Sequence, residues 1–424
     1  MGMNVGFYIA RKNYLGHFGP LIDYFQEKGS SVTLLCDNRK KPKGYKSYLY
    51  PEVESVQQIF HDSKVKAFHS TEEFINIIGN NIDVVFFIAF NSIATEAMNL
   101  LGRQRKVIFA HLQSGGDIMY NKGISSADVV YIFSEDWKQW WKKWLLHFNI
   151  VSEGQKEKIF EQVDSKPVIS GFPQADHMVH YDRGVIFEKY GIPEDKKVVL
   201  LLPFPWRVKF CIWSHVIYKP QKKLLKLIKL IFKRQFKTIL KISKFADDLQ
   251  VSQAIKEFAQ KNNAFFIVKG RLKNKVPAYL EKIADSIVFD KTYYPYTTME
   301  LMYIADLSIC FFSDAIKESV AAGTPCVCLG PSRREDWTHY ARRFFLKEFS
   351  PEPSSYYNCE NVVFNESVDD FARQFPNKTF DDYPLDKKNR DSFIKKFLGF
   401  SDLRSSERIY NDISQRIASW ENDG

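Results

Sequence analysis

The sequence predicts an α/β protein of two Rossmann-like, doubly wound domains, and two observations carry this prediction. Short apolar runs alternate with helical stretches in two separate series, one beginning at residue 4 and the other near residue 197. Continuous apolar strands joined by helices are typical of a parallel sheet that is covered on both faces. The second observation is the length of 424 residues, which is enough for two domains with a core each.

The expected strands follow from the apolar runs. In the first half we expect a helix at 18–28 and strands at 4–10, 31–36, 82–89, 106–110 and 128–133. In the second half we expect strands at 198–202, 264–269, 286–289, 307–312 and 325–329. From residue 385 on, the chain loses strand character and predicts two helices. The expected organisation is two domains, 1–180 and 181–385, facing each other across a cleft, followed by C-terminal helices at 386–424.

Composition and cysteine usage narrow the class of protein. Hydrophobic residues make up 45%, aromatic residues 15% and charged residues 26% of the chain, a globular profile that argues against extended disorder. Residues 1–12 begin with a strand-like run and lack the pattern of a leader, so we expect no secretory signal. The six cysteines form no Cys-x-x-Cys pair, and four lie in apolar runs. They indicate reduced core residues of a cytoplasmic protein.

The basic excess is concentrated in one segment. Residues 206–244 hold 12 Lys and Arg and no Asp or Glu. The rest of the chain then has 48 basic residues (60 − 12) against 50 acidic ones, a balance of −2. A nucleic-acid binder would be expected to spread its positive charge over a face built from several elements. We therefore expect no nucleic-acid partner.

Within an insertion at 206–250, residues 222–244 have the pattern of a basic amphipathic helix. Seven lysines recur every three or four positions, and apolar residues fall mostly on the opposite side. Such a helix is too charged to span a bilayer but suits the interface with anionic headgroups. The alternative is a solvated helix packed on its own core, although surface helices normally mix acidic and basic residues. We favour contact with an anionic membrane surface, at the inner face of the cell membrane.

Besides the basic segment, a stripe of tryptophans also departs from the alternation of apolar strands and helices. Trp137, Trp140, Trp141 and Trp144 follow helical spacing, with lysines between them. Tryptophan prefers the membrane–water interface because its ring is apolar and its indole N–H needs a partner. A stripe that faces the core or the cleft between the domains is an equal alternative.

The first candidate for chemistry follows the first strand. Gly16 and Gly19 flank His17 and permit a tight turn, and Pro20 suits the first turn of a helix. A histidine at the carboxyl end of this strand projects into the crevice where open α/β sheets bind ligands. We expect His17 to be a general base for an acceptor hydroxyl, since an unperturbed histidine titrates near neutral pH. The alternative is a loop histidine that bonds to the backbone.

The second candidate is the strand-to-helix turn that begins at Ser313 and Asp314. Free backbone N–H groups at such a turn donate hydrogen bonds to a phosphate, and Glu318 on the helix can reach a ribose hydroxyl. Lys269 and Arg271, at the end of another strand, can neutralise a diphosphate in the same crevice. For each basic residue alone, a surface charge at a strand end is the alternative.

These motifs resemble a known group of enzymes. The loop at 16–20, the run Ser-Gly-Phe-Pro-Gln-Ala-Asp at 170–176 and the run Ser-x4-Glu-x4-Gly-x-Pro at 313–325 look like motifs of GT-B glycosyltransferases, such as the peptidoglycan GlcNAc transferase, and of non-hydrolysing UDP-GlcNAc 2-epimerases. Residues 266–271, 299–306 and 402–409 resemble CDP-glycerol glycerophosphotransferases and capsule-type transferases of bacterial surface polysaccharides. The resemblance covers most of the chain except 206–250.

The resemblance implies roles for both domains. The domain at 181–385 would bind the nucleotide of the donor, with Ser313 on phosphate and Glu318 on ribose, and the domain at 1–180 would bind the acceptor near His17. Two departures favour sugar transfer over glycerol-phosphate transfer: the usual Lys-x-His-Pro run is Lys269-Gly-Arg271 here, and Asp-Tyr-Ser-Ser is Phe311-Phe-Ser-Asp314. The chain has no Asp-x-Asp, so no metal is implied, and basic residues and a helix N-terminus would stabilise the leaving phosphate.

The leading hypothesis is therefore a membrane-peripheral GT-B glycosyltransferase. It would move a sugar from a UDP-, CDP- or CMP-linked donor, a substrate and not a cofactor, to a lipid-linked or polymeric surface-glycan acceptor. The alternatives are a polyol-phosphate transferase, a UDP-sugar 2-epimerase and a catalytically silent scaffold. A soluble nucleotide-sugar substrate needs no bilayer, which counts against the epimerase.

Overall fold

The structure is a computed structural model of the chain. It describes residues 2–39, 50–79, 81–88, 92–102, 106–114, 127–149, 152–203, 248–270, 276, 278–289, 293–311, 313–330 and 346–422. The expected amphipathic helix at 222–244 and Arg271 lie outside the described residues. The chain divides into two compact units. Unit 1 comprises residues 1–180, 291–297 and 394–424, and unit 2 comprises 181–290 and 298–393.

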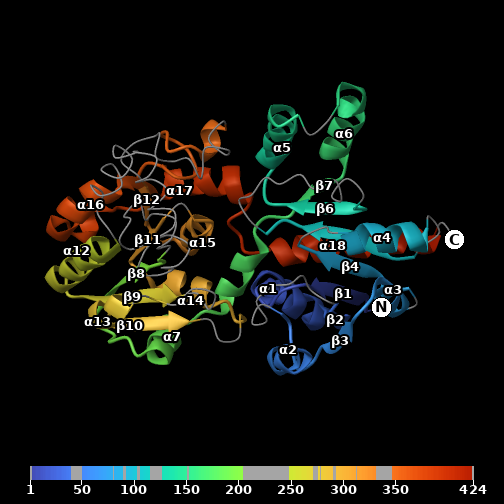
Figure 1. Cartoon of the computed structure of the whole chain (residues 1–424), viewed down its shortest axis with the longest axis horizontal. Coiled ribbons are helices and arrows are strands. Elements are labelled where there is room, and N and C mark those ends of the chain that lie inside the picture. Colours follow the sequence, from blue (N-terminus) through green and yellow to red (C-terminus); the bar gives the residue numbers. More distant parts are fainter. Residues whose placement is uncertain are drawn as a thin grey trace, which may run out of the picture. The chain divides into compact units, whose positions relative to one another are not determined.

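Unit 1 contains a seven-stranded parallel sheet in the order β3-β2-β1-β4-β5-β6-β7 (Figure 1). Its strands are β1 (Asn4–Ile9), β2 (Ser31–Asp37), β3 (Lys64–Phe68), β4 (Val84–Phe87), β5 (Ile108–Leu112), β6 (Val129–Ile132) and β7 (Pro167–Ile169). Its helical elements are α1 (Tyr14–Glu27), α2 (Val53–Ile59), α3 (Thr71–Ile78), α4 (Ser92–Leu101), α5 (Asp136–His147), α6 (Glu153–Ser165), the 3-10 segment η3 (Pro173–His180), the π-helical turn η8 (Ile394–Leu398) and α18 (Ser405–Asn422).

Unit 2 contains a six-stranded parallel sheet in the order β10-β9-β8-β11-β12-β13. Its strands are β8 (Lys197–Leu201), β9 (Ala264–Gly270), β10 (Ser286–Phe289), β11 (Leu307–Cys310), β12 (Cys326–Gly330) and β13 (Val363–Ser367). Its helices are α7 (Arg183–Tyr190), α12 (Asp248–Lys261), α13 (Ala278–Ile283), α14 (Thr297–Ile304), α15 (Ala315–Ala322), α16 (Val368–Gln374) and α17 (Lys387–Phe393), and short 3-10 turns lie at Lys347–Phe349, Phe375–Asn377 and Phe380–Asp382.

Each sheet has helices on both faces, as the apolar strands predict. In unit 1, alternate residues of the strands pack against α1, and Ile409 and Ile413 of α18 join the same core. On the opposite face, Tyr8 packs against Phe74 of α3. In unit 2, Val268 and Ile309 share a core with α12 and α16. The expected α/β architecture of two doubly wound sheets is therefore confirmed.

The strand orders locate a topological switch point in each unit. In unit 1 the chain proceeds outward from β1 through β2 and β3, then returns to β4 on the other side of β1. In unit 2 it proceeds from β8 through β9 and β10, then returns to β11. Ligands of open α/β sheets bind at the carboxyl ends of the strands beside such a point. The two expected binding regions are therefore the segments that follow β1 or β4 and those that follow β8 or β11.

Several elements differ from the sequence prediction. Strands β3, β7 and β13 were not expected: β3 carries two lysines, β7 has three residues, and β13 ends in polar residues. Helix α1 begins at Tyr14, four residues before the expected start. Gly16, Gly19 and Pro20 are consequently inside this helix, and the expected tight turn at the glycines is wrong.

The tryptophan stripe belongs to the core of unit 1. Trp137, Trp140 and Trp141 of α5 are buried. The indole N–H of Trp137 donates to the carbonyl of Phe397 at 3.0 Å, and Trp140 stacks on the Phe397 ring with 5.3 Å between the centroids. The core interpretation is therefore confirmed for these three residues. Phe397, 260 positions along the chain, satisfies the indole N–H of Trp137, and no local pattern in the sequence could reveal this partner.

Four aspartates repeat one structural device across both units. Each directly precedes a strand, and its carboxylate accepts the backbone N–H of a residue on the neighbouring strand at 2.7–2.8 Å. Its own N–H donates back to the carbonyl of that same residue. The four are Asp83 on Asn4, Asp128 on Phe109, Asp285 on Phe266 and Asp306 on Val198. Each aspartate thus completes the hydrogen bonding at the first residue pair of two parallel strands.

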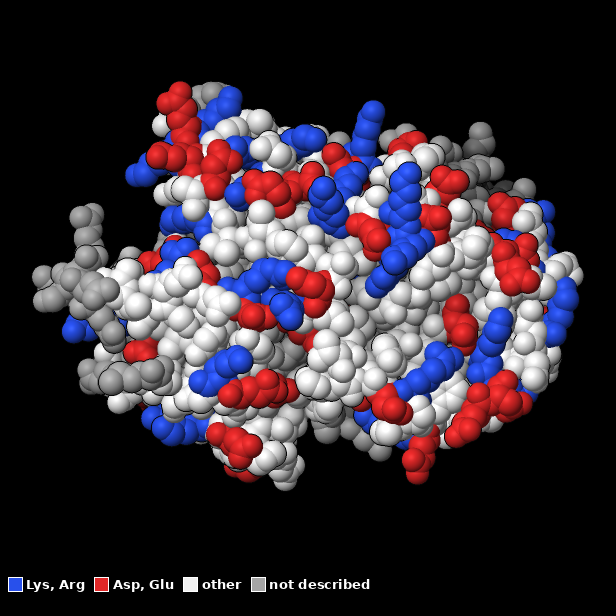
Figure 2. All heavy atoms as spheres, turned by 180° about the vertical axis from the view of Figure 1, so that it is seen from behind, with Lys and Arg blue, Asp and Glu red and all other residues white. Residues whose placement is uncertain are grey.

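Surface charge and cysteines agree with the balance calculated from the sequence. In the view of Figure 2, Lys and Arg side chains are interspersed with Asp and Glu over the described residues. Cys36, Cys310, Cys326 and Cys328 are buried, Cys359 is half-buried, and these five described cysteines are free. Among the described residues, no helix is both long and apolar enough to cross a membrane.

Candidate functional site

The candidate nucleotide site begins at the turn between β11 and α15, on the switch point of unit 2. Ser313 is buried, and its hydroxyl accepts the N–H of Ala315 at 3.2 Å. Asp314 occupies the N-cap position with helical backbone angles, and its side chain makes no capping bond. The Ser313 side chain therefore organises the first turn of α15, and a serine hydroxyl that accepts in this way still has a proton that it can donate.

Glu318 lies one turn further along α15 and is 4% exposed. Tyr356 lies beside this turn, because its hydroxyl donates to the carbonyl of Asp314 at 3.2 Å. Burial raises the pKa of Tyr356 well above its ordinary value, and the negative charges of Asp314 and Glu318 raise it further. The phenol therefore stays protonated. A buried carboxylate in the first turn of a helix is stabilised by the helix dipole, and it is a strong acceptor for ligand hydroxyl groups.

The register of the sheet brings Lys269 to the same face as α15. Val268 and Ile309 pack on the α12 face, so Lys269 and Cys310, one residue further, point to the opposite face. That face carries α15, since Ser308 and Ser319 of α15 bond through their hydroxyls at 2.8 Å. Strands β9 and β11 are separated by β8 alone. The Cα atoms of Lys269 and Cys310 are therefore about 10 Å apart, two strand spacings.

The far end of α15 is held rigidly. Gly323 follows the helix in the left-handed conformation, with φ of 80°. The Arg390 guanidinium donates to the carbonyls of Val320 at 2.8 Å and Ala321 at 2.7 Å. Positive charge at a helix C-terminus is favourable, and these bonds satisfy carbonyls that the helix leaves open. Arg390 thus anchors the helix that carries Glu318.

The candidate acceptor residue, His17, lies in the first turn of α1, on the switch point of unit 1. Its Nδ1 is 2.6 Å from the side-chain nitrogen of Gln174, which lies in η3 and is 1% exposed. The motif at 16–20 and the motif at 170–176 therefore meet. The Tyr296 ring lies near His17, with 6.4 Å between the two ring centroids.

The glycines beside His17 are required by close packing. A Cβ on Gly19 would lie 2.0 Å from the ring of Tyr294, and a Cβ on Gly16 would lie 3.0 Å from the carbonyl oxygen of Tyr293. Both contacts come from the segment 291–297, which belongs to unit 1. The glycines therefore let this distant segment lie directly on α1, which is the physical reason that the turn interpretation fails.

Two half-buried carboxylates fix the surroundings of His17. Asp23 of α1 accepts the hydroxyl proton of Tyr294 and lies 3.6 Å from the Nε2 of His177, and burial raises its pKa. Asp176 of η3 accepts the backbone N–H groups of Ser405, at 3.1 Å, and Ser406, at 2.5 Å, at the start of α18. Burial raises the pKa of Asp176 to about 6. Segment 291–297, η3 and α18 are thereby tied to α1.

The sequence did not indicate several residues of these regions. Gln174 is part of a recognised motif, but nothing in the motif assigns it to His17, which is 157 positions away. Tyr356 and Arg390 reach α15 from 42 and 70 positions away. No local pattern reveals such partners. No group of three or more His, Cys, Asp or Glu among the described residues could hold a metal ion.

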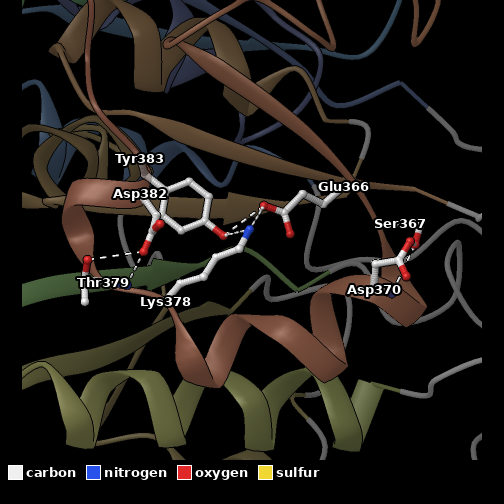
Figure 3. A network of polar contacts seen from close by, with 7 residues as sticks. All are labelled: Glu366, Ser367, Asp370, Lys378, Thr379, Asp382 and Tyr383. Carbon is white, nitrogen blue, oxygen red and sulfur yellow. Dashed lines mark hydrogen bonds and ion pairs between the residues drawn. The ribbon is translucent and has the colours of Figure 1, made fainter.

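A separate polar network stabilises the edge of unit 2 (Figure 3). Glu366 at the end of β13 accepts from Lys378 and from the hydroxyl of Tyr383, both at 2.8 Å. Burial raises the pKa of Tyr383 far above its ordinary value, so the phenol remains a donor. Because β13 is the edge strand, this network lies away from the β8–β11 switch point and has a structural role.

Two doubly wound parallel sheets in one chain define a GT-B-like α/β fold, and comparison with solved structures agrees. The wall teichoic acid polymerase TagF, in a histidine variant, matches with a TM-score of 0.57 and 12% identity over 99% of this chain and 90% of that one. A putative UDP-N-acetylglucosamine 2-epimerase from Listeria monocytogenes matches with 0.54 and 11% identity over 98% and 97%. The S. aureus MnaA–UDP complex matches with 0.53 and 12% identity over 98% and 97%. No family model and no curated protein matches the sequence.

Proposed function

We propose that this protein is a metal-independent glycosyltransferase of surface-glycan assembly. It transfers a sugar from a nucleotide-activated donor to a lipid-linked or polymeric glycan acceptor. The observation that carries the proposal is the turn at the β8–β11 switch point, where Ser313 and a buried Glu318 open a rigidly held helix. A hydroxyl and a buried carboxylate of this kind suit the phosphate and the ribose of a nucleotide.

In this proposal the two units divide the substrates. Unit 2 binds the donor nucleotide through Ser313, Asp314 and Glu318, and Lys269 with Arg271 neutralises the leaving diphosphate. Unit 1 binds the acceptor, with His17 as the catalytic residue at the reacting hydroxyl. The likeness to TagF and to UDP-binding MnaA supports a nucleotide-linked substrate, and a further TagF match was soaked with CDPG.

A polyol-phosphate transferase is the second candidate, and the match to a teichoic acid polymerase favours it. A UDP-sugar 2-epimerase is the third, because two matches are epimerase-type proteins. A panel of UDP, CDP, CMP and GDP in a thermal-shift assay identifies the base, since a ligand at 100 times its Kd stabilises the native state by about 2.7 kcal/mol. Turnover is then measured on the sugar, glycerol and 2-epimer substrates of that base. Stabilisation without turnover of any donor would favour a silent scaffold.

The proposed location is the inner face of the cell membrane, through the basic segment 222–244. Its lysine stripe supports this on sequence alone. Each lysine near an anionic surface is worth about 1 kcal/mol. Replacing Lys226, Lys229, Lys233 and Lys237 with Glu is expected to release the protein from anionic liposomes, with activity on a soluble acceptor retained. Co-sedimentation of that variant at the wild-type level would refute the tether.

A further inference from the structure

The carboxyl end of β2 in unit 1 carries a charged network that the proposed function does not use. Asp37 is the last residue of this strand and is 2% exposed. Its carboxylate accepts the hydroxyl proton of Tyr8 at 2.6 Å. It also accepts from Arg39, at 3.0 Å from Nε, 2.9 Å from Nη2 and 3.1 Å from the backbone N–H. These four bonds use the four lone-pair positions of the carboxylate.

The occupied carboxylate of Asp37 decides which ligands this edge of the sheet can recognise. Ligands of open α/β sheets bind beside the carboxyl ends of the strands. In dinucleotide-binding sheets an acidic residue accepts from a ribose hydroxyl, and an arginine nearby accommodates a phosphate instead. Asp37 has no lone-pair position left for a hydroxyl group. Recognition at the end of β2 therefore depends on hydrogen-bond donors.

The Arg39 guanidinium supplies such donors. It has five N–H groups, and Asp37 takes one on Nε and one on Nη2. The N–H groups that Asp37 leaves include one on each Nη atom, and these two form a fork that matches two oxygens of a phosphate. The Arg39 side chain is 27% exposed and that of Asp37 is 3% exposed, so the guanidinium is the part of the network that a ligand can reach.

The guanidinium is also held in one orientation. Tyr8 is fully buried, and its ring packs on Phe68 and Phe87, with 6.1 Å and 5.1 Å between the centroids. The phenol therefore fixes the Asp37 carboxylate, and two parallel bonds to that carboxylate fix the plane of the guanidinium. The hydrogen bonds to Asp37 raise the pKa of Arg39, so its charge is permanent. A donor that is already oriented loses little conformational freedom when it binds a ligand.

The charge of the surrounding chain favours an anion. Residues 38–51 contain five Lys or Arg and no Asp or Glu. Four of the five lie outside the described residues and count here only through their charge. The next acidic residue along the chain, Glu52, pairs with Lys12 at 3.2 Å. The ion pair of Arg39 with Asp37 is therefore followed by a stretch with a net positive charge.

We infer that Arg39 is a phosphate-binding residue of the acceptor site, so that the acceptor carries a phosphate group near its reacting hydroxyl. The inference rests on the proposed function for the assignment of unit 1 to the acceptor. His17 follows β1 and Arg39 follows the neighbouring strand β2, so one acceptor can present its hydroxyl to the first and its phosphate to the second. Tyr8 and Asp37 are positioning residues. A lipid-linked diphosphate and a polymer of phosphate esters both have suitable oxygens, and a neutral glycan has none.

The side-chain Nε–H of Arg39 reports binding without any turnover assay. In ¹⁵N NMR spectra of the whole protein, the Arg39→Lys variant identifies this signal by its loss. Glycerol phosphate or a short alkyl diphosphate is expected to shift the signal saturably, and sodium chloride of equal ionic strength is not. The shift should persist in Ser313→Ala, because Ser313 lies at the proposed nucleotide turn of unit 2. An unmoved signal, or an equal shift with sodium chloride, would overturn the inference.

The two probes also distinguish the sources of the phosphate. Tighter binding of the alkyl diphosphate would support the inference with a lipid-linked acceptor. Tighter binding of glycerol phosphate would support it with a polymer of phosphate esters as the acceptor.

Acceptor kinetics test the role of Arg39 once a donor substrate is known. Arg39→Lys keeps a positive charge beside Asp37 and removes the fork. We expect the KM of a phosphate-bearing acceptor to rise about tenfold, roughly the effect of losing a hydrogen bond to a charged group, with kcat nearly unchanged. The KM of a phosphate-free analogue should stay the same. Tyr8→Phe, which releases the Asp37 carboxylate, should give a smaller rise. Equal changes in KM for the two acceptors would overturn the inference.

Arg373→Lys is the matched control. Arg373 also bonds to an aspartate of its own segment, Asp370, but it lies in unit 2. This variant should keep the wild-type KM and the wild-type shift of the Arg39 signal. Denaturation midpoints establish that both lysine variants are folded, and an equal rise in KM for the two would contradict a specific role of Arg39. If no donor turns over, the proposed function fails, and the NMR titration alone decides the inference.

Discussion

The two switch-point helices, α1 of unit 1 and α15 of unit 2, share a topology and differ in what surrounds them. Both follow a strand beside the crossover of a parallel sheet. Helix α15 carries a buried carboxylate, Glu318, and its far end is capped by Arg390. Helix α1 carries His17 in its first turn, and the Tyr294 ring packs against Gly19 of the same helix. Topology therefore selects the position of a site, and the distant segments that pack on it select its chemistry.

The largest effect that separates the two helices is expected from His17. His17→Ala should lower turnover roughly 10²- to 10⁴-fold, because a positioned catalytic group contributes on that scale. Nucleotide binding should be unchanged, since the proposed nucleotide-binding residues belong to unit 2. Steady-state kinetics together with calorimetric nucleotide titration test this. If nucleotide affinity fell with turnover, the division of roles between the helices would be wrong.

The next effect concerns the pH dependence of stability in unit 1. Burial raises the folded-state pKa of Asp176 to about 6. A carboxyl group with a raised pKa binds a proton in the folded state that the unfolded chain has already lost, so stability falls as pH rises from about 4 to 6. A shift of this size corresponds to about 3 kcal/mol at most. Asp176→Asn, which is neutral throughout, should lack this loss.

Urea denaturation of wild type and Asp176→Asn at several pH values measures the difference. The free energy of unfolding of the variant relative to wild type should rise between pH 4 and 6 and stay constant above that window. A constant difference across the whole range would mean that Asp176 titrates normally in the folded protein.

On the α15 side, Ser313→Ala and Glu318→Ala are expected to weaken nucleotide binding and to leave transfer geometry in unit 1 intact. A hydrogen bond to a charged group is worth about 1.5–3 kcal/mol, which corresponds to roughly a 10- to 150-fold increase in Kd. Glu318→Gln is the matched variant, because it keeps the shape and removes the charge. Wild-type affinity in both alanine variants would exclude the proposed phosphate and ribose roles.

The packing around α1 predicts a smaller effect on stability. Gly19→Ala should destabilise the protein by about 1–3 kcal/mol, because the new Cβ would lie 2.0 Å from the Tyr294 ring and the ring must move. Gly154 in α6 is the control, since nothing lies within 4 Å of its Cβ position. Gly154→Ala should be neutral or stabilising by up to about 1 kcal/mol. Equal denaturation midpoints for the two variants would contradict the close approach.

The smallest effect tests whether the two units are built alike. Asp83 and Asp306 precede the equivalent strands β4 and β11, and each accepts an N–H at 2.7 Å. Alanine at either position should cost about 1–2 kcal/mol, and asparagine less, since its carbonyl still accepts. The ion pair of Asp306 with Arg183 is half exposed and adds little. Hydrogen exchange should show faster opening of the strand that pairs at the mutated position. This strand is β1 in the Asp83→Ala variant and β8 in the Asp306→Ala variant, and the other unit should be unchanged.

The sequence by itself determined the elements whose patterns are local. The apolar runs identified ten of the strands because parallel strands buried on both faces are continuously apolar. The strand-to-helix turn at Ser313 and Asp314 was also readable, since it directly follows an apolar strand and opens the next helix. The apolar pattern did not identify strands β3 and β13, because charged and polar residues interrupt it there.

The tertiary structure alone decided the contacts between residues far apart in the chain. Segments far away in the chain decide four features: the start of α1, the close packing at Gly19, the burial of Trp137 and the partner of His17. These segments lie near residues 294, 397 and 174. A helix or strand pattern reports which face of an element is buried, but not which residue covers it. The hydrogen-bond partner of His17 is therefore a property of the folded chain, because Gln174 lies 157 positions away.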